Sequence, residues 1–283
     1  MAFGTLAHKA GKLPLRQLTQ QLSELDIDFV QLAMSKAIGD IDTSLGRLSP
    51  GLANHIAEAF HQQGIRIGAL GCYINPVHPD PVQRKAEIAR FKEHLRFARD
   101  FGTTIVATET GDLTTYLPQD AERYEEIGWS IFRSTVEELA EEAEKWGVYV
   151  GLEPVCTHTL TSPQKMKRIM EEVPSGHIGV VLDPCNLFIR GNFERRDQVV
   201  DECFELFADR IVLAHLKDVT PSFRERDGRP QSAKPGTGVF DIAGFLRKLQ
   251  VHKPFLDVSI EDTDAHEMND VIHYLKNITA KQQ

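Results

Sequence analysis

Eight short apolar segments recur along this 283-residue chain, and each is followed by a longer segment with the periodicity of an amphipathic helix. Some are continuous, such as Ile-Gly-Val-Val-Leu at residues 178–182, which is typical of a strand buried on both faces in a parallel sheet. We predict strands at residues 3–7, 29–34, 65–72, 104–110, 148–153, 178–183, 211–216 and 255–260. This alternation favours an α/β fold, a single (β/α)8 barrel over residues 1–283, rather than an open doubly wound sheet.

The segments between the predicted strands carry the start and stop signals of helices. Asp80 and Ser162 each precede a proline, which is the pattern of an N-cap followed by proline at the first helical position. Gly102 and Gly147 follow apolar residues spaced three and four apart, where we expect helices to end. No linker divides these units, so we expect one domain.

An open sheet that binds a dinucleotide would carry a glycine-rich turn after its first strand. The first loop, residues 7–12, lacks the G-x-G-x-x-G pattern. A related stretch, Pro-Gly-Thr-Gly at 235–238, follows a long loop instead of a strand. We therefore interpret it as a glycine turn, with Asp241 as the N-cap of the next helix.

The composition disfavours several classes of function. Hydrophobic residues make up 41% of the chain and charged residues 26%, which suits a large core. The net charge of −9 would repel a nucleic acid. We see neither a signal peptide nor an apolar segment that could span a bilayer, so we expect no membrane partner. Four widely spaced cysteines predict free thiols in a reducing compartment, and we expect a cytoplasmic protein.

One metal-competent residue ends each of the last four predicted strands. These residues are Glu153, Asp183, His215 and Glu261, and each follows an apolar run. The carboxyl ends of the strands form the active face of a (β/α)8 barrel, so we expect the four side chains to meet at one rim. The largest gap between them, from 215 to 261, contains the long loop at 220–238.

Three carboxylates at one barrel mouth would repel each other, and burying them unpaired would be costly. A divalent cation removes this conflict. Oxygen ligands with one imidazole suit Mn²⁺, Mg²⁺, Co²⁺ or Zn²⁺, whereas the absence of a cysteine cluster disfavours iron–sulfur and copper chemistry. The sequence therefore predicts one divalent metal ion at the open end of the barrel.

The order of these four residues resembles the xylose-isomerase-like TIM-barrel superfamily. The resemblance is strongest to its sugar phosphate isomerase/epimerase branch, which includes keto-sugar epimerases, hydroxypyruvate isomerase and inosose dehydratase. It covers nearly the whole chain. The matching motifs are Gly-Leu-Glu-Pro at 151–154, Leu-Asp-Pro-Cys-Asn at 182–186, His-Leu-Lys-Asp at 215–218, Pro-Gly-Thr-Gly at 235–238 and Ser-Ile-Glu at 259–261.

The resemblance implies that Glu153, Asp183, His215 and Glu261 bind the metal, commonly manganese. It also implies that Glu153 and Glu261 are the catalytic acid/base pair, which would move a proton through an enediolate of a small ketose or related polyol. One position departs from the family, where many members have a histidine in place of Asn186. Asparagine can form hydrogen bonds but cannot carry a proton at neutral pH, so a substrate assignment cannot be transferred.

Further polar residues are candidates for substrate binding. They lie near the predicted strand ends or in the long loop, and they are Asn186, His158, Glu109, Lys217 and Arg224. Lys217 is two residues beyond His215, so on an extended strand its side chain should also turn inward, where it could bind substrate or balance charge. Arg224 and Arg226 could reach a phosphate or carboxylate, or could lie in a solvated loop. Tyr73, after the third strand, is a possible wall residue.

The favoured function is thus a metal-dependent isomerase or epimerase, with a small sugar or polyol as its partner and a possible homo-oligomer by analogy. A lyase of the inosose-dehydratase type would use the same enediolate and stays open. A non-catalytic barrel that binds metal or sugar is a further alternative. The DNA-repair endonucleases of the superfamily need extra histidines on the third and fourth strands, where this chain has Cys72, Tyr73 and Glu109.

Overall fold

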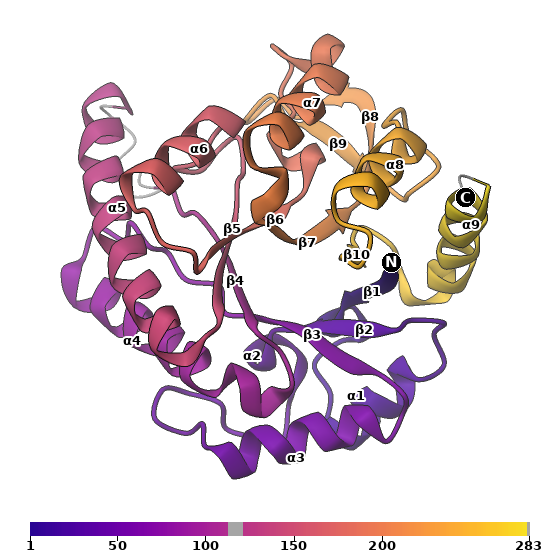
Figure 1. The fold of residues 1–283 in the computed structure, drawn as a ribbon. Coiled ribbons are helices and arrows are strands. Elements are labelled where there is room, and N and C mark those ends of the chain that lie inside the picture. Colours follow the sequence, from indigo (N-terminus) through magenta and orange to yellow (C-terminus); the bar gives the residue numbers. More distant parts are fainter. Residues whose placement is uncertain (113–120, 282–283) are drawn as a thin grey trace.

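The computed structural model, which describes residues 1–112 and 121–281, is a closed barrel of parallel strands surrounded by helices (Figure 1). The barrel strands are β1 (Ala2–Leu6), β2 (Phe29–Leu32), β3 (Arg66–Gly71), β4 (Ile105–Glu109), β5 (Tyr149–Glu153), β6 (Ile178–Leu182), β7 (Ile211–Leu216) and β10 (Asp257–Ile260). The first and last of them pair and close the barrel, with Ala2 opposite Asp257 and Thr5 opposite Ile260. The predicted (β/α)8 barrel is confirmed, and the ends of its strands differ from the predicted ends by no more than two residues.

Helices cover the outside of the barrel (Figure 1). They are α1 (Leu15–Leu22), α2 (Met34–Ala37), α3 (Pro50–His61), α4 (Pro81–Phe97), α5 (Ala121–Trp146), α6 (Pro163–Glu172), α7 (Arg196–Phe207), α8 (Ile242–His252) and α9 (Met268–Ala280). Short 3₁₀ helices add η1 (Ala7–Ala10), η2 (Ala98–Phe101), η3 (Pro184–Leu187), η4 (Phe193–Arg195), η5 (Ala208–Arg210) and η6 (Ala265–Glu267). In the part of the chain that the structure describes, no helix is both long and apolar enough to cross a membrane.

The predicted helix boundaries are present. The side chain of Asp80 accepts a hydrogen bond from the backbone N–H two residues later, and Ser162 and Asp241 accept from the N–H three residues later. Gly102 and Gly147 have φ values of 80° and 64°, a left-handed conformation that disfavours residues with a Cβ. These local signals set where each helix starts and ends.

An apolar layer fills the barrel interior below the carboxyl ends of the strands. Its buried members come from five strands: Phe29, Ala69, Ala107, Val181 and Leu213. Because side chains alternate along a strand, residues two positions later face the same interior, one layer nearer the carboxyl end. These residues are Gln31, Gly71, Glu109, Asp183 and His215. The polar residues of the rim are thus positioned by the same strands that bury the apolar layer.

The ring of Phe29 requires glycine on both neighbouring strands. A Cβ on Gly4 would lie 2.7 Å from a ring atom, and one on Gly68 would lie 2.5 Å from another. The guanidinium of Arg66 lies over the same ring, 5.0 Å from its centroid, and pairs with Asp257. These contacts close the barrel interior at its amino end.

The long loop after β7 holds an antiparallel hairpin, β8 (Asp218–Phe223) and β9 (Pro230–Ala233), that the sequence does not predict. Pro221 and the polar residues around it hide the period of a strand. The carboxylate of Asp218 accepts hydrogen bonds from the N–H groups of Val219, Gly236, Gly238 and Phe240, at 2.8–3.1 Å. Asp218 and the 235–238 turn therefore anchor the hairpin beside the barrel mouth.

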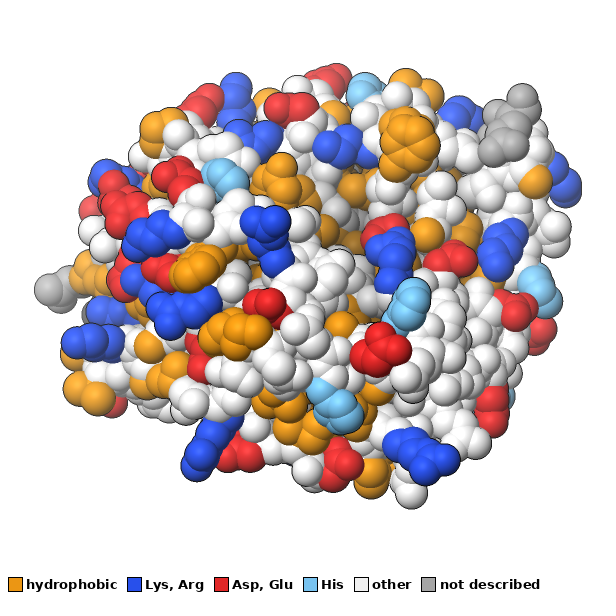
Figure 2. Space-filling view, turned by 60° about the horizontal axis from the view of Figure 1, so that its bottom comes forward, with side chains coloured by type: hydrophobic (Ala, Val, Ile, Leu, Met, Phe, Trp, Pro, Cys, Tyr) orange, Lys and Arg blue, Asp and Glu red, His pale blue; other side chains and the backbone are white. Residues whose placement is uncertain are grey.

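Charges of both signs are mixed on the molecular surface. Figure 2 shows Lys and Arg side chains interspersed with Asp and Glu over the face that it displays, without a continuous basic stripe. Proteins that bind nucleic acids usually display such a continuous basic stripe.

Candidate active site

Glu153, His215 and Glu261 meet inside the barrel mouth. Nδ1 of His215 lies 3.2 Å from Oε1 of Glu153 and 3.1 Å from Oε1 of Glu261. One ligand atom from each of the three residues lies within 4.8 Å of the others, so together they form a candidate site for a single metal ion. We call these three side chains the metal cluster. Glu153 ends β5, His215 is in β7, and Glu261 follows β10, so three strands bring the cluster together.

Asp183 lies beside the metal cluster and reaches it through Lys217. Nζ of Lys217 is 2.8 Å from Oδ2 of Asp183 and 3.2 Å from Oε2 of Glu261. The other oxygen of Asp183 accepts a hydrogen bond from the N–H of Cys185. Oδ2 makes this ion pair with Lys217 and has no further hydrogen-bond partner among the described residues. This buried oxygen therefore has unused capacity to accept a ligand.

Asn186 joins the cluster to the residues around it. Its Nδ2 donates to Oε1 of Glu153 at 2.8 Å, and its Oδ1 accepts from Nζ of Lys217 at 2.9 Å. The same oxygen accepts from Nη2 of Arg229 at 3.1 Å. Asn186 is buried, and its amide orientation follows from these three contacts. Arg229 is in the unpredicted hairpin, so the sequence analysis missed it.

Gln31 fixes the orientation of His215 from across the barrel. Its Nε2 donates to the hydroxyl of Tyr73 at 3.1 Å, which leaves its Oε1 to face Nε2 of His215 at 2.8 Å. Nε2 of His215 must then carry a proton, and Nδ1 is the nitrogen that faces the two glutamates. The sequence analysis missed Gln31, although it is two residues beyond Phe29 and shares its inward parity.

Burial and charge act in opposite directions on the titratable groups of the cluster. Burial raises the pKa of Glu153 and of Asp183. Burial would also raise the pKa of Glu261, but His215 and Lys217 outweigh it and hold that pKa below its usual range. Burial would lower the pKa of His215, yet Glu153 and Glu261 raise it well above its usual value. Without a metal, two cationic side chains, His215 and Lys217, therefore hold the carboxyl groups together. These carboxyl groups belong to Glu153, Asp183 and Glu261.

The donor set suits a divalent cation. With Nε2–H committed to Gln31, a neutral His215 would direct the lone pair of Nδ1 at two carboxylate oxygens, an arrangement that a cation between them relieves. Oxygen and imidazole donors match Mg²⁺, Mn²⁺, Co²⁺ or Zn²⁺. Cys185 is adjacent, but its thiol donates a hydrogen bond to the backbone oxygen of Lys217, and burial raises its pKa well above the usual value.

The other residues predicted to bind substrate lie around a hollow next to the cluster. The hollow has a volume of about 850 Å³ and is lined by Asp112, Thr157, His158, Arg224, Arg226, Asp227 and Arg229. Glu109 contacts one of these lining residues, with its Oε2 at 3.8 Å from Nδ1 of His158. Burial lowers the pKa of His158, which favours a neutral imidazole. The structure thus brings His158, Glu109 and Arg224 to one place, whereas Asn186 and Lys217 contact Glu153 and Glu261 of the cluster directly.

Comparison of the sequence with a family profile identifies the family of the chain. The profile described as xylose isomerase-like TIM barrel matches residues 19–278. The chain belongs to the xylose isomerase-like TIM-barrel family. The resemblance noted from the strand-end motifs is therefore confirmed. No curated protein matched the chain in a sequence search.

Solved structures share the fold of this xylose isomerase-like barrel at low sequence identity. The 3-keto-D-glucoside 4-epimerase YcjR from E. coli is 15% identical with a TM-score of 0.76, over 98% of this chain and 99% of that one. A xylose isomerase-like protein from Mycobacterium smegmatis in complex with magnesium is 15% identical with a TM-score of 0.73, over 100% and 98%. The IOLI protein with a zinc atom is 17% identical with a TM-score of 0.69, over 100% and 98%. At these identities the likeness shows the fold alone.

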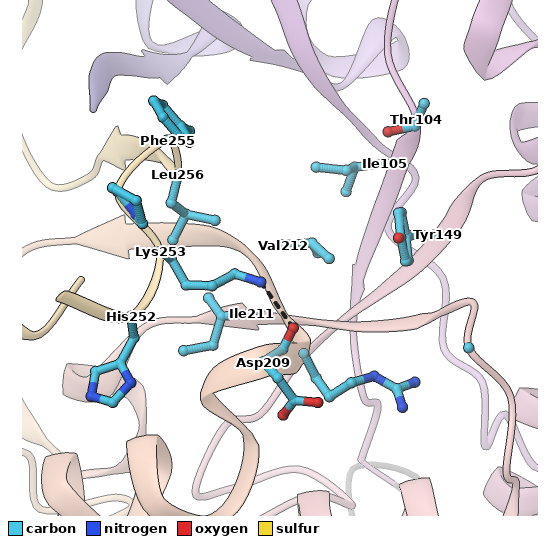
Figure 3. Close-up of a pocket in the computed structure, with 13 residues that line it drawn as sticks. Thr104, Ile105, Tyr149, Asp209, Ile211, Val212, His252, Lys253, Phe255 and Leu256 are labelled. Atoms are coloured by element: carbon cyan, nitrogen blue, oxygen red, sulfur yellow. Dashed lines mark hydrogen bonds between the residues drawn. The ribbon is translucent and has the colours of Figure 1, made fainter. Parts of the chain in front are cut away.

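A second hollow lies at the opposite end of this xylose isomerase-like barrel (Figure 3). It has a volume of about 480 Å³ and is bordered by the first residues of β4, β5 and β7 and by the segment before β10. Lys253 crosses it and donates to the backbone oxygen of Asp209 at 2.8 Å. Its single acidic lining residue among those described is Asp209, so it offers no group of carboxylates like the metal cluster.

Proposed function

We propose that this barrel is a divalent-metal-dependent isomerase or epimerase of a small ketose or related polyol. The observation that carries the proposal is the approach of Glu153 and Glu261 to the same nitrogen of His215 from two different strands. We assign Glu153, Asp183, His215 and Glu261 as the ligands of one metal ion, most simply manganese, with magnesium, cobalt or zinc as substitutes. Asp183 belongs to this set because its buried Oδ2 is paired only with Lys217 among the described residues, so a metal ion can share or replace that contact.

A bound divalent cation would supply Lewis acidity, which makes the C–H next to a substrate carbonyl easier to deprotonate. The protein supplies the groups that move this proton. Glu153 and Glu261 flank the site, so one, as a carboxylate, can remove the proton to give an enediolate and the other, as a carboxylic acid, can donate its own proton to a different carbon or face. Asn186 holds Glu153 by a hydrogen bond, and Lys217 holds Glu261 by an ion pair.

The family supports this reading because one structural neighbour is described as a 3-keto-D-glucoside 4-epimerase. Two further neighbours are described with magnesium and with zinc. The apolar layer beneath the cluster supports it as well, because a site closed on one side excludes water from a carbanion-like intermediate.

The test is solvent deuterium incorporation into a panel of ketoses, inososes and hydroxypyruvate. Metal-stripped protein is compared with protein reconstituted with Mn²⁺. The proposal predicts metal-dependent deuteration at a carbon next to the carbonyl, which Glu153→Gln and Glu261→Gln reduce by at least about 100-fold. Glu137→Gln, an exposed position on α5, is the matched control and should exchange like the wild type.

Two outcomes would change the assignment. Deuteration accompanied by loss of water would favour the lyase of the inosose-dehydratase type. Tight Mn²⁺ binding without exchange in any member of the panel would contradict the proposed chemistry and would favour a barrel that only binds metal or sugar.

A further inference from the structure

The β8–β9 hairpin gathers three arginines on one side of the 850 Å³ hollow next to the metal cluster. Arg224 directly follows β8, Arg226 lies in the turn, and Arg229 directly precedes β9. The backbone holds this tip in shape, since Arg224 and Arg229 pair through the N–H of the first and the oxygen of the second at 2.8 Å. A volume of this size is within the range of small-molecule sites.

These arginines are largely uncommitted. No residue within the described ranges accepts a hydrogen bond from the side chain of Arg224 or Arg226. Arg229 makes one side-chain hydrogen bond, to Asn186. Two acids also line the hollow, but Asp227 already accepts a hydrogen bond from the backbone N–H of Arg229 at 3.1 Å. The lining thus has three guanidinium groups, two of them without a side-chain hydrogen bond to a described residue, against two acids, which indicates a local preference for an anion.

His158 adds a polar side chain to the same lining, beside Glu109. It lines the hollow, and its Nδ1 is buried without a hydrogen-bond partner among the described residues. A buried polar atom without a partner is costly, so a site that leaves one beside a cavity is suited to a polar ligand.

Arg229 links the lining of the hollow to the metal cluster. Arg229 donates to Asn186, and Asn186 donates to Glu153, so two successive hydrogen bonds span the distance from guanidinium to cluster. One residue, Asn186, thus separates Arg229 from Glu153, so an anionic group held by the arginines would lie near the cluster.

We propose that the substrate of this site carries an oxyanion, a carboxylate or a phosphate monoester, at the end remote from its reacting carbons. Arg224, Arg226 and Arg229 bind this group, and they select acids or phosphates over neutral sugars. Guanidinium groups suit this task because their paired N–H donors match the oxygens of carboxylates and phosphates. The inference rests on the function proposed above in taking the metal cluster as the reaction centre.

The test compares three probes that share the same ketose end: D-fructose, D-fructuronate and D-fructose 6-phosphate. Their binding to Mn²⁺-loaded protein is measured by calorimetry at constant ionic strength. The inference predicts that at least one anionic probe binds about tenfold or more tightly than fructose, an advantage of about 1.4 kcal/mol. The paired variant Arg224→Ala with Arg226→Ala should remove most of that advantage. Arg247→Ala, an exposed arginine on α8, is the matched control and should keep it.

The outcomes separate this inference from the proposed function. Equal binding of the three probes, or an advantage that survives the paired variant, would overturn the anion site even if neutral ketoses exchange deuterium. Arginine-dependent binding of an anionic probe without deuterium exchange would support the anion site and count against the isomerase. The anion with the larger arginine-dependent advantage identifies the carboxylate or the phosphate as the natural group.

Discussion

The amide oxygen of Gln31 lies 2.8 Å from Nε2 of His215, so a residue of β2 orients an imidazole of β7 across the barrel. Both side chains are fully buried. The contact leaves Nδ1 of His215 to face Glu153 and Glu261, as a metal ligand requires. Partners of this kind commonly determine how well a histidine binds its metal.

Replacing Gln31 with leucine should therefore weaken Mn²⁺ binding without removing any ligand. We expect a loss of about 10- to 100-fold in affinity by calorimetry, because the imidazole loses its acceptor. Gln31→Glu keeps an acceptor and should bind more tightly than Gln31→Leu. Gln17→Leu, an exposed position on α1, is the control. An unchanged affinity in Gln31→Leu would show that the contact does not orient His215.

Lys217 should stabilise the protein most when no metal is present. Lys217→Met leaves Asp183 and Glu261 buried without their cation, and we expect the free energy of unfolding in urea to fall by about 3 kcal/mol in metal-free protein. Lys248→Met breaks a more exposed pair with Asp201 and should cost less than about 1 kcal/mol. Equal losses in the two variants would argue against the buried ion pair.

The strand ends could be predicted from the sequence because they depend on local periodicity. Glu153 and His215 each end an apolar run, and a period of two sets which face of the strand each side chain occupies. Once eight β/α units indicate a barrel, the carboxyl ends must share one rim. The fold and the positions of these residues follow from that logic.

Gln31 and Arg229 could not be assigned in this way. Gln31 lies in a predicted strand, but its partner is on another strand across the interior, and that pairing depends on the closure and register of the barrel. Arg229 depends on a hairpin whose Pro221 hides the strand pattern and whose shape is set by the carboxylate of Asp218. Contacts between distant segments therefore define the part of the site that the sequence analysis missed.

Asp218 should be important for the hairpin. Asp218→Ala removes an acceptor for four backbone N–H groups in a buried setting, and we expect a loss of about 3 kcal/mol or more in the free energy of unfolding. The same variant should increase amide hydrogen exchange between residues 218 and 240. Amide exchange in α3, a helix remote in sequence from the hairpin, is the internal reference. Unchanged protection of the hairpin would contradict the anchoring role.

His94 should make stability depend on pH. Burial lowers its pKa to about 4, below the 6.5 of an unfolded chain. The unfolded state therefore takes up the proton first as the pH falls below 6.5, so stability decreases between pH 6.5 and pH 4. From pH 8 to pH 5 we expect a loss on the order of 2 kcal/mol from this group. His94→Met should lack that loss, whereas His55→Met, an exposed position on α3, should retain it.

The location of the metal ion tests the central claim most directly. In anomalous diffraction from crystals loaded with Mn²⁺, the account predicts one strong peak at about 2.0–2.3 Å from Nδ1 of His215 and from oxygens of Glu153, Asp183 and Glu261. A second group with the geometry for a metal, Asp264, His266 and Glu267, lies near the surface and serves as the internal comparison. A peak only at that surface group, or none at His215, would contradict the account.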